Sequence, residues 1–224
     1  MNMPLLELHK VSKSYGPDGG KNAAVLDRIS LTLDPGEALG LTGPSGSGKT
    51  TIARLALGIE TPNSGRVLFQ GHPVTDSRGD VSRHYYSRVQ IIWQDPKGFL
   101  NPFLPVLTSI MEPMAAFGRG TAADRHKRAY HLMEMMDLSS DLAHHKPGRL
   151  SGGQCQRVAI ARALSISPEL LICDEALVSL DLPQQVKIIR LLGRMQKELQ
   201  LALLFISHDE DTVNTLCPRV ISLI

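Results

Sequence analysis

The sequence predicts an α/β domain that has a mixed core sheet, an antiparallel β-subdomain and an inserted α-helical subdomain. Short apolar runs of strand length, such as residues 170–173 and 201–206, alternate with helical patterns. Residues 5–33 alternate apolar and polar positions, and helical patterns interrupted by prolines fill residues 96–167. With 224 residues and 42% hydrophobic content, the chain is long enough to bury the core of one such domain.

The first predicted element is a pair of antiparallel strands between Leu5 and Leu33. They flank a turn made of Gly16, Pro17, Asp18, Gly19 and Gly20. We expect these strands to pack against the core, which begins at Ala38 and resumes from Glu169 onward.

A phosphate-binding loop is predicted where the first core strand gives way to a helix. Residues 37–42 are typical of a short buried strand, and residues 50–57 of a helix that ends at Gly58. Between them, eight consecutive residues match the pattern G-x-x-x-x-G-K-[ST]: Gly43, Pro44, Ser45, Gly46, Ser47, Gly48, Lys49 and Thr50. Glycines let successive backbone N–H groups point at phosphate oxygens, and the helix dipole adds a favourable field for an anion.

This loop predicts a site for a nucleoside triphosphate and Mg²⁺. Lys49 would reach the β- and γ-phosphates, and Thr50 would place its hydroxyl on Mg²⁺. Thr51, the next residue of the same helix, belongs to the same candidate site. The alternative for the motif is an ordinary glycine-rich turn.

The middle of the chain is predicted to be helical and to carry a second anion-binding feature. Helices are expected at residues 108–117 and 122–136, the second capped by Thr121. A further helix runs to about Ile166 and opens at a short motif: Leu150, Ser151, Gly152, Gly153 and Gln154. Ser151 is a suitable N-cap, and the two glycines leave the helix N-terminus open to a phosphate. The alternative is a simple capped helix.

One chain therefore carries two phosphate-binding helix N-termini but a single lysine-bearing loop. A nucleotide has one γ-phosphate, so the economical interpretation is that each N-terminus serves a different nucleotide. Two chains would then exchange these contacts.

Two carboxylates are expected at the end of a buried strand. Residues 170–173 are apolar and are followed by Asp174 and Glu175. Ligands of an open α/β sheet gather at the strand ends, so these acids should lie beside the phosphate loop. Because adjacent strand residues point to opposite faces, Asp174 would face Mg²⁺ and Glu175 the water that attacks the γ-phosphate. The alternative is a pair of solvated turn residues.

Three more polar residues suit a phosphoryl-transfer site. Gln94 ends the apolar stretch 89–93, and its amide would hold water or Mg²⁺. His208 follows the strand pattern of residues 201–207 and would donate a hydrogen bond to the γ-phosphate. Asp181, just past the acidic pair, would order the neighbouring loop.

In this order the motifs resemble the nucleotide-binding subunits of ABC transporters, which are P-loop NTPases, over nearly the whole chain. The resemblance implies a single ABC ATPase domain over residues 1–224, with residues 1–95 and 168–224 as RecA-like core plus β-subdomain and residues 96–167 as helical subdomain. It also implies ATP as the nucleotide and Tyr15 as the aromatic that stacks on adenine. A strand-end tyrosine without a ligand is the alternative for Tyr15. The family further implies a head-to-tail dimer in which the Ser151 segment of one subunit covers ATP bound at Lys49 of the other.

Two segments resemble one branch of the family, the bacterial importers of peptides and nickel, to which metal-chelate importers also belong. Residues 94–102 resemble the branch's Q-loop with its trailing Leu-Asn-Pro. Residues 174–181, which begin with the two acidic residues, resemble the corresponding segment in the nickel-type members of the branch. The branch implies two transmembrane permease subunits, a second homologous ATPase or a copy of this chain, and indirectly an extracytoplasmic binding protein. The alternatives are the motor of an exporter or lipoprotein-release system and a soluble ABC ATPase without a transport role.

Composition favours a soluble protein in a reducing compartment, and the resemblance implies that a partner holds it at the cytoplasmic face of the bacterial inner membrane. The net charge is +2, from 24 basic and 22 acidic residues without a basic stripe, so no nucleic-acid partner is expected. Apolar stretches reach about eight residues, against roughly 20 for a membrane span. Residues 1–10 do not resemble a secretory signal, and three unpaired cysteines suit a reducing compartment.

Overall fold

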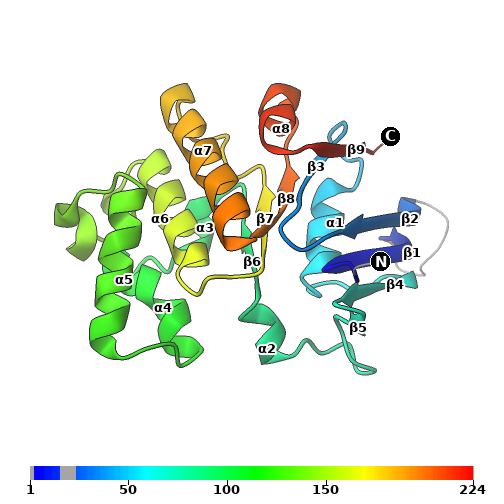
Figure 1. Ribbon diagram of the computed structural model, residues 1–224, viewed down its shortest axis with the longest axis horizontal. Coiled ribbons are helices and arrows are strands. Elements are labelled where there is room, and N and C mark those ends of the chain that lie inside the picture. Colours follow the sequence, from blue (N-terminus) through cyan, green and yellow to red (C-terminus); the bar gives the residue numbers. More distant parts are fainter. Residues whose placement is uncertain (1–2, 16–23, 224) are drawn as a thin grey trace.

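The computed structural model describes residues 3–15 and 24–223, which form two sheets and a group of helices (Figure 1). The strands are β1 (Leu6–Ser14), β2 (Ala24–Leu33), β3 (Ala38–Thr42), β4 (Ser64–Phe69), β5 (His72–Pro73), β6 (Val89–Ile92), β7 (Leu170–Asp174), β8 (Ala202–Ile206) and β9 (Arg219–Ser222). The α-helices are α1 (Lys49–Ala56), α2 (Arg83–Tyr86), α3 (Pro96–Phe99), α4 (Val106–Ala116), α5 (Ala122–Met135), α6 (Gly152–Leu164), α7 (Leu182–Leu199) and α8 (Glu210–Leu216). Two 3₁₀ turns, η1 (Ser140–His144) and η2 (Pro147–Arg149), precede α6.

The core sheet has five strands in the order β6-β7-β8-β3-β9. Every pair among them is parallel, for example Ile172 beside Leu204 and Gly40 beside Phe205. All five residues of β3, β7 and β8 are buried, as expected for parallel strands covered on both faces. The predicted α/β class is confirmed. The core sheet is parallel throughout the described residues and not mixed as predicted, because the antiparallel strands form a separate sheet.

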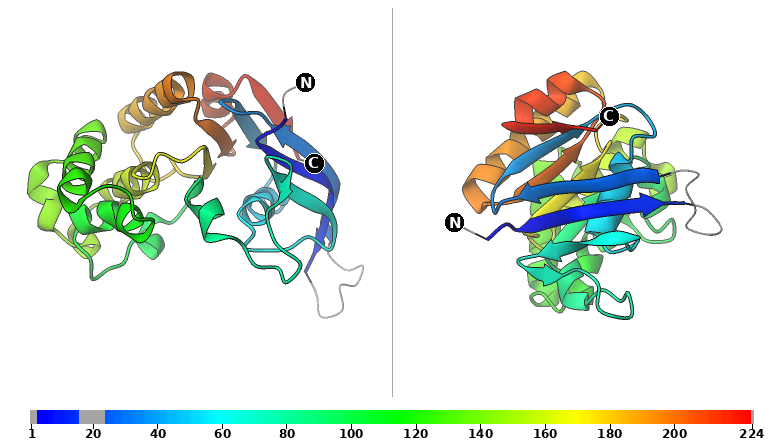
Figure 2. Two further views of the ribbon diagram at one scale, coloured as in Figure 1. Left: turned by 60° about the horizontal axis from the view of Figure 1, so that its bottom comes forward. Right: turned by 90° about the vertical axis from the view of Figure 1, so that its right-hand side faces the viewer.

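The second sheet is antiparallel and has the order β2-β1-β4-β5. Leu6 pairs with Leu33 on one side and with Phe69 on the other. Leu6, Leu8 and Val11 are buried, so the alternating pattern of this segment faces the core as predicted. The expected turn at residues 16–20 lies outside the described residues. Figure 2 shows this sheet beside α1, at the opposite side of the molecule from α4 and α5.

Two apolar cores lie on the two faces of the core sheet. Leu171 and Cys173 of β7 belong to the core shared with α4, α5, α6 and α7. Leu170 and Ile172 of the same strand belong to the core shared with α1 and the antiparallel sheet. The period-two alternation of a strand therefore holds the helical part on one face and the β-subdomain on the other.

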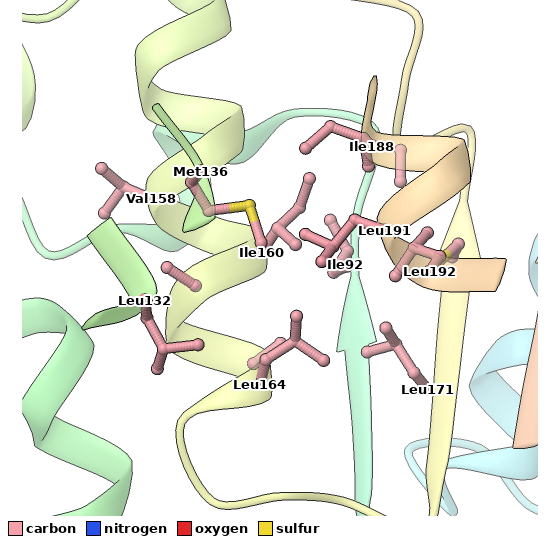
Figure 3. Packing of buried hydrophobic residues seen from close by; sticks show 14 of the residues in the cluster. Ile92, Leu132, Met136, Val158, Ile160, Leu164, Leu171, Ile188, Leu191 and Leu192 are labelled. Atoms are coloured by element: carbon pink, nitrogen blue, oxygen red, sulfur yellow. The ribbon is translucent and has the colours of Figure 1, made fainter. Parts of the chain in front are cut away.

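Helix α6 joins the helical part to the sheet. Figure 3 shows its residues Val158, Ile160 and Leu164 between Leu132 of α5 and the side chains of β6, β7 and α7. The predicted helices are all present, and their ends differ by one or two residues. Among the described residues, no helix combines the length and apolar character that a membrane crossing needs.

Candidate active site

The polar residues predicted to act together are brought to one edge of the core sheet. The loop after β3, Gln94 after β6, Asp174 and Glu175 at the end of β7, and His208 after β8 all follow parallel strands, so they share the carboxyl edge. They surround a cavity of about 480 Å³. Its lining is Tyr15, Val25, Ser45, Gly46, Gly48, Lys49, Thr50, Thr51, Gln94, Asp174, Glu175 and His208.

The loop before α1 has the backbone form that only glycine adopts readily. Gly43, Gly46 and Gly48 have φ angles of +141°, +85° and +93°. At Gly48 a Cβ would also lie 2.5 Å from the Leu26 side chain, so a side chain there would push the loop away from β2. The loop therefore curls around the N-terminus of α1, where the first backbone N–H groups lack intrahelical partners.

The Lys49 ammonium is folded back over the loop. Its Nζ donates hydrogen bonds to the carbonyl oxygens of Gly43 at 2.7 Å and Pro44 at 2.8 Å. These contacts hold a positive charge at the cavity wall, beside the helix N-terminus. A polyanion in the cavity would meet a fixed cation and backbone N–H groups together.

Asp174 forms the buried acidic side of the cavity and has the environment that a hard cation needs. Its Oδ1 is buried and has no hydrogen-bond partner among the described residues. Burial raises the pKa of this carboxyl, although a hydrogen bond from Thr50 acts in the opposite direction. A divalent cation beside Thr50 and Asp174 would give the unpaired oxygen a partner, so these residues fit Mg²⁺.

Glu175 and His208 form a hydrogen-bonded pair at the rim. Glu175 Oε2 lies 2.9 Å from His208 Nδ1, and 14% of the glutamate side chain is exposed against 68% of the histidine. Glu175 also has a φ of +50°, unusual for a residue with a side chain, and its N–H donates to the carbonyl oxygen of Ile206. The backbone thus turns this carboxylate out of the strand toward the cavity, where it is able to accept a proton from water.

The predicted Ser151 segment and Asp181 do not line this cavity. Ser151 caps α6 with a capping box in which its Oγ accepts from the N–H of Gln154 and the Gln154 side chain accepts from the N–H of Ser151. Nothing lies within 4 Å of a Cβ placed at Gly152, whereas a Cβ at Gly153 would lie 3.0 Å from Gln184 Oε1, so the helix N-terminus is open on its Gly152 side. Asp181 caps α7 through the N–H of Gln184.

Sequence reasoning missed three residues of this neighbourhood. Val25 lines the cavity from β2, whereas Lys13 and Glu60 surround Tyr15. Tyr15, which the resemblance implies is the aromatic that stacks on adenine, lines the cavity. Neither Glu60 nor Lys13 belongs to a motif, and only the fold brings the start of the chain beside the residues that follow α1.

Comparisons with known proteins agree on one family. The family model described as "ABC transporter" matches residues 26–178. A putative peptide import ATP-binding protein of Brucella abortus (strain 2308) is 41% identical over 208 residues, covering 92% of this chain and 62% of that protein. The chain therefore spans less than two thirds of the length of that relative. The nickel import ATP-binding protein NikE of Pseudomonas putida is 41% identical over 225 residues, covering 99% of this chain and 82% of that protein.

Solved structures share the fold over nearly the whole chain. An ATP-binding cassette solved as a dimer in a post-hydrolysis state bound to ADP and Pi has a TM-score of 0.86 at 30% identity, covering 97% of this chain and 94% of that chain. The protein cbiO1 from Clostridium perfringens, part of the ABC transporter complex cbiONQ, has a TM-score of 0.80 at 29% identity, covering 99% of this chain and 85% of that chain.

Proposed function

Because this chain belongs to the ABC transporter family, we propose that it is the ATP-binding and ATP-hydrolysing motor subunit of a bacterial ABC importer. The observation that carries the proposal is the meeting of Lys49, Asp174 and Glu175 around one cavity. Relatives named for peptide import and nickel import favour uptake of peptides, nickel or a metal chelate over export.

The first step is the binding of ATP in the cavity. The triphosphate would lie on the backbone N–H groups of residues 45–50, and the Lys49 ammonium would exchange its carbonyl contacts for phosphate oxygens. Thr50 and Thr51 follow in the first turn of α1, where the helix dipole favours an anion. The base would stack on Tyr15 at the other end of the cavity.

Mg²⁺ would be held by Thr50 and Asp174, with Gln94 as a third candidate ligand at the same edge. When bound, it neutralises charge on the phosphate oxygens. The buried, unpaired oxygen of Asp174 is what fits these residues to the ion.

Hydrolysis is assigned to Glu175. Its carboxylate would orient a water toward the γ-phosphorus and take a proton from it as the new O–P bond forms and the bond to the β-phosphate oxygen breaks. The His208 ring, whose Nδ1 lies 2.9 Å from Glu175 Oε2, would donate a hydrogen bond to the γ-phosphate. Gln94 would position the same water without competing for its proton.

A second chain would complete the site. Ser151, Gly152, Gly153 and Gln154 lie outside the cavity, and the N-terminus of α6 is open on its Gly152 side. We infer that this segment binds the phosphates of ATP held by a companion ATPase, either a homologue or a copy of this chain, with Asp181 ordering the loop between them. The ATP-binding cassette solved with ADP and Pi is itself a dimer.

We further propose that the complex contains two transmembrane permeases, with an extracytoplasmic binding protein delivering cargo to them. The chain would then be a peripheral protein of the cytoplasmic face of the inner membrane. Residues 94 to 105, between the cavity and α4, would transmit closure to the permeases.

The decisive test replaces Glu175 by Gln. We expect ATP binding to persist and hydrolysis to fall by about 10²-fold or more, the range for loss of a general base. Glu198→Gln, at an exposed position of α7, is the matched control and should hydrolyse ATP at the parent rate. Hydrolysis by Glu175→Gln at the rate of the parent protein would refute the role assigned to this carboxylate.

A second test separates binding from chemistry. Lys49→Ala should weaken binding of a fluorescent ATP analogue, because the fixed cation at the cavity wall is lost. Lys197→Ala, an exposed lysine of α7, should bind like the parent. Purification from a native membrane then tests the importer assignment, since two permeases and a related ATPase should accompany the chain.

A further inference from the structure

A cluster of charged side chains surrounds the hydroxyl of Tyr15. The Tyr15 O–H donates to Glu60 Oε2 at 2.5 Å, and the Thr51 hydroxyl of α1 lies 3.4 Å from the Tyr15 hydroxyl oxygen. Glu60 also pairs with Lys13 at 3.5 Å and with Arg54 at 3.3 Å. Glu60 therefore links the end of β1 to helix α1 through the ring that lines the cavity.

We propose that Glu60 is a positioning residue for the nucleotide base, acting through Tyr15. This inference rests on the proposed function, in which ATP occupies the cavity. Glu60 is not among the residues that line the cavity, so it would not touch the phosphates. Its contribution to binding is to hold the tyrosine ring in one orientation before the base arrives, which lowers the entropy lost on binding.

Lys13 determines which ring face the base can use. Its Nζ lies over the Tyr15 ring at 5.4 Å from the centroid. The same Nζ donates to the carbonyl oxygen of Thr61 at 2.9 Å, and it pairs with Glu60. Only 15% of the Lys13 side chain and 16% of the Glu60 side chain are exposed, so this pair is held in place. One face of the ring is covered by the lysine, and a flat base would stack on the other face.

The charges of the cluster separate the proposed orienting role from a simple electrostatic role, because the two roles predict different changes in ligand affinity when Glu60 is removed. Glu60 is one anion between two cations, Lys13 and Arg54. If Glu60 acted on ATP through its charge alone, its removal would leave two unneutralised cations and strengthen binding of any polyphosphate. If Glu60 acts by orienting the ring, its removal weakens only ligands that carry a base.

The experiment compares binding of ATP and of inorganic tripolyphosphate to the full chain. Glu60→Ala should weaken ATP binding by about 2-fold to 10-fold, the range for loss of an aromatic stacking contact. Binding of tripolyphosphate should stay unchanged or become tighter. Glu60→Gln keeps an oxygen that accepts from Tyr15 and should restore most of the ATP affinity. Glu112→Ala, which breaks the ion pair with Arg162 in the helical part, is the matched control and should change neither ligand.

Tyr15→Phe provides the second variant, because it keeps the ring and removes only the hydroxyl. It should weaken ATP binding by the same factor as Glu60→Ala, and the double variant should be no weaker than either single one. Additive losses would overturn the proposal, as would equal losses for ATP and tripolyphosphate or an unchanged ATP affinity in Glu60→Ala. If the parent protein binds neither ligand, the proposed function itself fails, which is a different result.

Discussion

Gln156 is a buried amide whose replacement should stabilise the protein. It lies on α6, its side chain has no exposed surface, and neither Oε1 nor Nε2 has a hydrogen-bond partner among the described residues. A buried polar group without a partner loses its bonds to water and gains none in return. The change we consider is Gln156→Met, which keeps a similar unbranched shape and removes both polar atoms.

The expected magnitude follows from the cost of burying an unpaired amide. Protein substitution data place this cost at about 1–3 kcal/mol. Met fills the same space with apolar atoms, so the free energy of unfolding should rise by roughly this amount, less any loss from imperfect packing. For a domain of this size, each kcal/mol corresponds to a shift of about 2–4 °C in Tm.

Urea denaturation followed by circular dichroism would measure the change, with Gln185→Met as the matched control. The Gln185 Nε2 donates to the carbonyl oxygens of Leu177 at 3.2 Å and Leu180 at 3.0 Å. The same substitution there removes two hydrogen bonds and should lower the free energy of unfolding by about 1 kcal/mol or more. The two variants should therefore shift stability in opposite directions. A fall in Gln156→Met as large as in Gln185→Met would show that the buried amide is paired after all.

Three further predictions concern charge and backbone. Burial raises the pKa of Glu37, but hydrogen bonds from Arg219 and from the Asp34 N–H, with the charge of Arg219, together hold the pKa below 4.5, so these contacts stabilise the fold above that pH. Glu37→Gln should thus be less stable than the parent at pH 7, and the urea midpoints should converge as the pH falls from 4.5 through the lowered pKa of the folded state. Since burial raises the pKa of Asp174, Asp174→Asn should melt at a higher temperature than the parent in magnesium-free buffer, and a lower midpoint would contradict this. Gly48→Ala should cost more stability than Gly118→Ala, since both have positive φ but only the first meets neighbouring atoms within 4 Å; equal melting temperatures would argue against the clash.

The sequence predicted the core of the site because each of its parts follows a strand. Lys49, Gln94, Glu175 and His208 each lie just beyond an apolar run, and parallel strands necessarily end at one edge of their sheet. The α/β class, the antiparallel sheet and the three helices expected between residues 96 and 167 were predictable from the periodicity of apolar residues. The uniformly parallel order of the core sheet was not predictable, because an apolar run does not indicate whether the neighbouring strands are parallel or antiparallel to it.

What the sequence could not predict depends on side-chain contacts between distant segments. Glu60 follows a helix in a polar turn, and no local pattern separates it from a solvated glutamate; only its contact with Tyr15 distinguishes it. The burial of Gln156 could not be predicted from the sequence either, since a glutamine on a helix is usually exposed. Its complete burial results from α6 being packed on several sides, which depends on the whole fold.

Helix α6 links the helical part of the molecule to the core sheet. Its apolar residues Val158, Ile160 and Leu164 lie in the same cluster as Ile92 of β6 and Leu171 of β7 (Figure 3). A displacement of the helical part would strain the packing against the strand that precedes Gln94 and the strand that ends at Asp174, because close-packed interiors transmit strain. The N-terminus of the same helix is the segment proposed to bind a companion's ATP. If this segment binds a companion's ATP as proposed, the shared apolar cluster would connect that contact to the strand that precedes Gln94 and to the strand that ends at Asp174.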